Sequence, residues 1–91
     1  MAHPITTSGL AGGDVSTMHQ SGQSTSDWVG AHNTAVSPET PDGDTLSTTW
    51  TSQAGDEEVK TTRNPSETDA NFLRRHEAAY LLAMLDASPV P

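Results

Sequence analysis

Two histidines, His32 and His76, occupy the same place in two segments whose apolar residues recur with helical spacing. Each histidine follows an aromatic residue by four positions, Trp28 in the first segment and Phe72 in the second. Imidazole is the commonest metal ligand among side chains, so one hypothesis is a small histidine-based metal-binding protein with His32 and His76 as ligands.

A zinc site needs three or four convergent ligands. Further ligands would have to come from residues such as His19, Asp27 or Glu77, and no metal-ligand spacing joins these to the two histidines. The alternative is a structural role, in which each imidazole packs on its preceding aromatic ring and bonds to a backbone carbonyl or a strand threonine. The sequence favours the structural role.

Arg74, Arg75 and His76 form a basic cluster in an otherwise acidic chain. Neither arginine has an acid four residues away with which it would form an i,i+4 pair along the helix surface. We expect these arginines to pair with acids of other elements, such as Glu57, Glu58, Glu67 or Asp69, or to lie on a solvated face. Phosphate binding is the less favoured alternative.

The sequence contains no arrangement typical of an enzyme active site. It lacks a Gly-x-Ser-x-Gly nucleophile motif, and the glycines between Gly9 and Gly13 are not followed by the Lys-Ser/Thr of a phosphate loop. The acid pairs Asp42/Asp44 and Glu57/Glu58 fall in segments that read as hydrated turns. We therefore expect a protein that is not an enzyme and that uses no cofactor or small-molecule substrate.

These residues must be positioned by strands and helices of a small α+β fold. Alternating and β-branched residues predict strands at 14–19, 45–51 and 58–63, the last two forming an antiparallel hairpin with a slightly long acidic loop. A capping pattern at Ser24 begins one helix, which ends before Pro38, and the strongest helical pattern runs over 66–85. We expect the β-hairpin to pack on this C-terminal helix.

The chain divides into five predicted segments. They are a flexible N-terminal arm (1–13), a first strand–helix unit (14–37), a linker (38–44), the β-hairpin plus main helix (45–87) and a C-terminal tail (88–91).

A shift of the sequence by 44 residues suggests two degenerate β-β-α repeats. The shift superimposes Val15 on Val59, Thr17 on Thr61, Trp28 on Phe72, His32 on His76, and Thr7 on Thr51. In this alignment the first copy has lost its leading strand, because residues 2–8 match residues 46–51 poorly. Convergent amphipathic patterning of two unrelated helices is the alternative.

Composition favours association with another protein chain. The 91 residues are only 32% hydrophobic and contain no cysteine, so the core alone gives marginal stability and disulfides cannot add to it. The net charge of −8, with four basic residues, is a poor match for nucleic acid. No apolar run is long enough to span a membrane, and no secretory signal is evident, so we expect a soluble cytoplasmic protein.

The end of the main helix has more apolar surface than so small a domain can cover. Its residues from 78 to 85 are apolar nearly all round, which predicts burial on every side. The expected interface residues are Tyr80, Leu81, Leu82, Met84 and Leu85. The leading hypothesis is a non-enzymatic assembly module that forms a homo-oligomer or binds a protein partner. An acidic inhibitor or nucleic-acid mimic that binds a basic protein is the main alternative, and a metal-binding protein the third.

Overall fold

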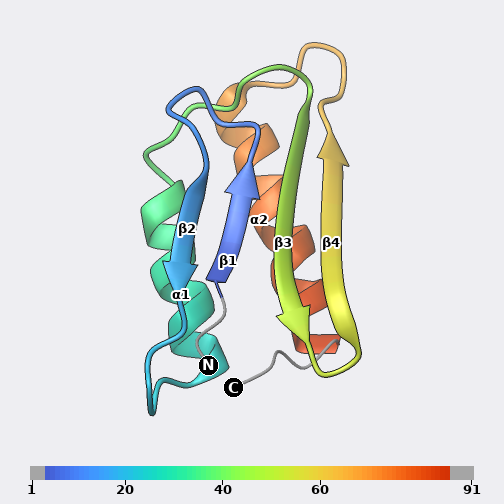
Figure 1. Cartoon of the computed structure of the whole chain (residues 1–91). Helices are drawn as coiled ribbons and strands as arrows, with labels where there is room; N and C mark the ends of the chain where they lie inside the picture. The colour runs from blue at the N-terminus through green and yellow to red at the C-terminus, as the bar shows by residue number, and fades with distance from the viewer. Residues whose placement is uncertain (1–3, 87–91) are drawn as a thin grey trace.

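The computed structural model describes residues 4–86, which form a four-stranded antiparallel sheet with two helices on one of its faces (Figure 1). The elements, in chain order, are β1 (Pro4–Ser8), β2 (Val15–Met18), α1 (Thr25–Val36), β3 (Thr45–Ser52), β4 (Gly55–Thr62) and α2 (Asp69–Asp86). The strand order is β2-β1-β3-β4. The predicted α+β fold, with a hairpin packed on a C-terminal helix, is confirmed.

The prediction of a flexible N-terminal arm over 1–13 is wrong for most of its length. Pro4–Ser8 is strand β1, which lies in the middle of the sheet and pairs with both β2 and β3. Leu10 is also buried, and it forms an isolated bridge to Pro41 in the segment expected to be a linker. The segment looked mobile because Ile5 is the only large apolar residue between Met1 and Leu10. The C-terminal tail 88–91 lies outside the described residues.

The hairpin of β3 and β4 is tighter than predicted. Ser52 pairs with Gly55, so only two residues lie between the strands, and the acids expected in the loop belong to β4. The Ser52 hydroxyl accepts a hydrogen bond from the Ala54 amide and lies 3.0 Å from the Gly55 carbonyl oxygen, to which it donates. Gly55 has a φ of 130°, a backbone conformation that other residues adopt rarely.

Both helices begin at hydroxyl caps, as the sequence predicts for the first. The Ser24 side chain accepts from the Asp27 amide, and the Thr68 side chain accepts from the Asn71 amide. The buried residues of α1 are Trp28, Val29, His32 and Val36, and those of α2 are Phe72, Leu73, His76, Tyr80 and Met84. The predicted apolar stripe is therefore the buried face of each helix, although Ala35 is exposed.

The two β-β-α units have matching hairpin registers. Equivalent pairs are Ile5–Thr17 and Leu46–Thr61, and likewise Thr7–Val15 and Thr48–Val59. The offset is 44 for the second strands and the helices, but 41 for the leading strands (Thr7 to Thr48). The prediction that the first unit lacks its leading strand is wrong, and Thr48, not Thr51, is the counterpart of Thr7. An origin by duplication stays a prediction.

Candidate functional site

A histidine from each helix bonds to two threonines of the sheet. In the first unit, His32 lies on the buried face of α1 and is inaccessible to solvent. Its Nε2 is 2.7 Å from the hydroxyl oxygen of Thr7 in β1, and its Nδ1 is 3.0 Å from that of Thr17 in β2. Both threonines point inward because side chains alternate along a strand, so the helix and both strands of the unit meet at one ring.

The second unit repeats this arrangement around His76, which is also fully buried. Its Nε2 and Nδ1 are each 2.8 Å from a hydroxyl oxygen, of Thr48 in β3 and Thr61 in β4 respectively. The two halves meet where Thr7 and Thr48 are paired in the sheet, with their hydroxyl oxygens 2.6 Å apart. Six side chains thus form a continuous Thr–His chain in the order Thr17, His32, Thr7, Thr48, His76, Thr61.

Both imidazoles are neutral near pH 7. Burial lowers the pKa of His32 to about 4, because a charged ring would lose its hydration without gaining a counter-ion. Burial likewise lowers the pKa of His76 to about 4, and the positive charge of Arg75 and the proximity of His32 act in the same direction. A neutral imidazole has one donor and one acceptor nitrogen, which suits hydroxyl partners on both sides.

Tyr80 fills the space between the two histidines. Its ring centroid is 5.7 Å from that of His32 and 5.5 Å from that of His76. Its hydroxyl donates a hydrogen bond to Asn33 Oδ1 on α1, and burial raises the pKa of the phenol. The tyrosine of α2 therefore ties the helices together beside the Thr–His chain.

The geometry at His32 and His76 leaves no nitrogen for a metal ion. Each of the four ring nitrogens is within hydrogen-bond distance of a threonine hydroxyl. Within residues 4–86, no group of three or more potential ligand side chains comes together. The strand threonines of the structural alternative account for both histidines, which are fully buried, although the aromatic ring found beside both is that of Tyr80.

The threonine partners were not predicted as a set, but the sequence contains a signal for them. Thr17, Thr48 and Thr61 each occupy a position on the apolar face of a strand, where the alternation predicts a buried residue. A buried hydroxyl needs a hydrogen-bond partner, and the histidine on the apolar face of each helix is the polar side chain that could supply one.

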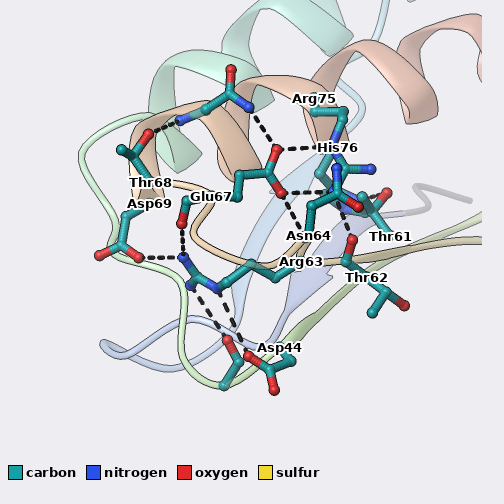
Figure 2. Close-up of polar contacts among 12 residues, drawn as sticks. Asp44, Thr61, Thr62, Arg63, Asn64, Glu67, Thr68, Asp69, Arg75 and His76 are labelled. Carbon is teal, nitrogen blue, oxygen red and sulfur yellow. Dashed lines mark hydrogen bonds and ion pairs between the residues drawn. The ribbon is translucent and has the colours of Figure 1, made fainter.

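Of the basic cluster, Arg75 forms an ion pair within the chain. The Arg75 guanidinium donates to both carboxylate oxygens of Glu67, at 3.0 and 2.8 Å, and to the Thr62 carbonyl (Figure 2). These bonds lower the pKa of Glu67 to about 2. Nearby, Arg63 lies 2.7 Å from an oxygen of Asp69 and stacks over the Phe72 ring. The hydrogen-bonded partner of Arg75 is thus Glu67, one of the four acids that the sequence suggested.

The predicted interface residues separate into a buried and an exposed group. Tyr80 and Met84 are fully buried in the chain's own core, so the prediction that they face a partner is wrong. Leu81 is half-buried against the same core. Leu82 and Leu85 are each 65% exposed.

The exposed residues lie on one side of α2. Ala78, Leu82 and Leu85 follow the i, i+4, i+7 spacing of a single helix face, and we refer to these three residues as the leucine surface. Helix α1 has 12 residues and α2 has 18, so the last turns of α2, with both leucines, have no counterpart in α1. Leu82 and Leu85 therefore belong to a part of α2 that the first unit lacks.

The opposite face of the sheet is polar and carries a shallow hollow of about 380 Å³. Hydroxyls of Thr6, Thr49 and Thr51 line it together with acids of β4. The acids bond across the hairpin: Glu58 accepts from Ser47 at 2.9 Å, and Asp56 accepts from Thr51 at 3.4 Å. This face differs in chemistry from the leucine surface.

Two further observations bear on the class of protein. No helix in residues 4–86 has the length and apolar character needed to cross a membrane. Comparison of the chain with protein-family models, curated proteins and solved structures finds no match.

Proposed function

We propose that this protein is a non-enzymatic assembly module that associates with a second copy of itself through the leucine surface of α2. The observation that carries the proposal is the 65% exposure of both Leu82 and Leu85 on adjacent turns of one helix. The remaining large apolar side chains of α2 are buried or half-buried, so these two leucines are a surplus that the fold itself does not use.

A second copy is the partner that the local chemistry favours. Ala78 is small, which lets another helix approach closely between the leucines of the two copies. Arg74, one turn before Ala78, is exposed and takes part in none of the ion pairs found in residues 4–86. In a chain of net charge −8, this arginine offers a cation to the acids of the other copy.

The expected association is weak. Burying an exposed leucine contributes roughly 1.5–3 kcal/mol, and about two thirds of that remains to be gained at a position that is 65% exposed. Two leucines from each copy then contribute roughly 4–8 kcal/mol, while association costs roughly 4–15 kcal/mol in lost freedom. At the favourable end the difference is about 4 kcal/mol, which corresponds to a dissociation constant of about 1 mM, so we expect a dimer that forms as the concentration approaches the millimolar range.

Light scattering on three proteins tests this proposal. The wild type should gain mass with concentration, and Leu82→Glu should stay monomeric because it places a charge in the contact. Ala31→Glu is the matched control, since it adds the same charge at an exposed position of α1 and should associate like the wild type. Equal behaviour of the two variants would contradict the role of the leucine surface.

A second candidate is binding of a basic protein by the acidic hairpin. The observation in its favour is the run Asp56, Glu57 and Glu58 beside the hollow on the polar face, where the nearest cation, Lys60, is 3.8 Å from Glu58. Such binding would weaken steeply with salt. A complex with a basic protein that is insensitive to salt, or that survives Glu57→Gln with Glu58→Gln, would rule out this candidate.

A further inference from the structure

The Thr–His chain contains one more polar hydrogen than it has hydrogen bonds between its members. It has five contacts between neighbouring polar atoms. Each of its four threonine hydroxyls brings one hydrogen, and each of its two neutral imidazoles brings one. Where the sixth hydrogen lies decides which nitrogen of each ring is protonated.

Equal tautomers on the two rings are unfavourable. If both rings carried hydrogen on Nδ1, Thr7 and Thr48 would both donate to imidazoles, and no hydrogen would lie between their oxygens 2.6 Å apart. If both rings carried it on Nε2, one of these two hydroxyls would accept twice and its own hydrogen would have no acceptor. Both threonines are fully buried, so water cannot satisfy that hydrogen.

Opposite tautomers fill every contact and leave the sixth hydrogen at one end of the chain. The two ends differ in their access to water. The side chain of Thr61 is buried at 6% exposure, whereas Thr17 is partly exposed. Within residues 4–86, neither hydroxyl has a hydrogen-bond partner other than its histidine. An end hydroxyl hydrogen is therefore better placed at Thr17, where it can donate to solvent.

We infer that the Thr–His chain has one fixed direction, with Thr61 as its first donor and Thr17 as its last acceptor, so that His76 is protonated on Nε2 and His32 on Nδ1. Thr61 donates to His76, His76 to Thr48, Thr48 to Thr7, Thr7 to His32, and His32 to Thr17. The two units have matching backbone registers, but they differ in which ring nitrogen of the histidine carries the hydrogen. This inference does not depend on association through the leucine surface.

The position of the spare hydrogen at Thr17 also fixes His32 independently of the second unit. Removal of the Thr48 hydroxyl divides the chain and leaves Thr17, His32 and Thr7 with three hydrogens for two contacts. Thr7 is fully buried and Thr17 is partly exposed, so the spare hydrogen should remain at Thr17 and His32 should stay protonated on Nδ1.

Long-range proton–nitrogen NMR correlations of the imidazoles near pH 7 test the inference. The wild type should show His76 protonated on Nε2 and His32 on Nδ1. Thr48→Val should leave His32 protonated on Nδ1, and Thr48→Ser, which retains the hydroxyl, should leave both rings as in the wild type. Equal tautomers, reversed tautomers or averaged nitrogens in the wild type would overturn the inference. So would a His32 that becomes averaged or protonated on Nε2 in folded Thr48→Val. If Thr48→Val does not fold, the wild-type spectrum decides alone.

Discussion

The hydroxyl oxygens of Thr7 and Thr48 lie 2.6 Å apart in the interior, where β1 and β3 pair at the centre of the sheet. Each hydroxyl also contacts a histidine of the helix that covers its own unit. This contact joins two otherwise separate sets of buried polar groups into one chain. It therefore links the two halves of the domain through side chains as well as through the backbone bonds of the sheet.

Loss of the Thr48 hydroxyl should be costly. Thr48→Val keeps the shape of the side chain but leaves Thr7 and His76 each without one partner, and an unpaired buried group costs roughly 1–3 kcal/mol. We expect a loss of about 2–4 kcal/mol in the free energy of unfolding, measured by urea denaturation. Thr49→Val is the control, because Thr49 is exposed on the other face, and it should change stability by less than about 0.5 kcal/mol. Equal effects would show that the chain adds no stability.

Stability should fall as the pH is lowered from 6.5 to 4. The folded protein keeps His32 and His76 neutral to a pKa of about 4, whereas in the unfolded chain both titrate near 6.5. The unfolded state therefore binds more protons in this interval. The free energy of unfolding falls as a result, by at most about 3 kcal/mol for each histidine. The contribution of the two neutral histidines to stability is fully present above pH 6.5. NMR titration of the ring protons gives the check, and a midpoint near 6.5 for either ring in the folded protein would contradict it.

The ion pair at the start of α2 should give a second loss of stability at lower pH. Bonds from Arg75 lower the pKa of Glu67 to about 2 in the folded protein, against 4.5 for an unperturbed glutamate. The contribution is present above pH 4.5 and is lost as the pH falls towards 2. Glu67→Gln should lower the urea midpoint at pH 7 and remove this lower part of the pH dependence. Glu58→Gln, the same change at an exposed strand position, should do neither.

Neighbouring apolar residues of α2 should differ sharply in their effect on folding. Met84 is fully buried, so Met84→Ala should cost roughly 2–5 kcal/mol of stability. Leu82 is 65% exposed, so Leu82→Ala should change the stability of the monomer by less than about 0.5 kcal/mol. Denaturation at low protein concentration measures both. A large loss for Leu82→Ala would mean that the chain's own residues cover the leucine surface.

The sequence predicted those elements whose apolar pattern is strong. The stripes around His32 and His76 identified the buried face of both helices, and the β-branched run at 45–51 identified β3. The strand Pro4–Ser8 was missed because most of it is polar, and its place in the sheet depends on pairing with β3, about forty positions away. No local pattern contains that information.

The residues of the candidate site likewise divide into those that a local pattern predicted and those that depend on distant contacts. The apolar pattern of residues 78–85 identified a surplus of apolar surface, which Leu82 and Leu85 expose, but it could not tell that Tyr80 and Met84 would be covered completely by the chain itself. Their burial depends on contacts with Ile5, Trp28 and Trp50 across the fold. The hydrogen-bond chain could not be predicted as a whole, since its central contact between Thr7 and Thr48 requires the β1–β3 register.

Sedimentation equilibrium of the wild type over a wide concentration range tests the proposed self-association most directly. From about 10 µM to about 1 mM, the weight-average mass should rise from the 9.6 kDa of one chain towards twice that value, as a weak dimer requires. Leu82→Glu should remain at the mass of one chain throughout. A wild type that stays monomeric up to the highest concentration, or a Leu82→Glu variant that associates as strongly, would contradict assembly through the leucine surface.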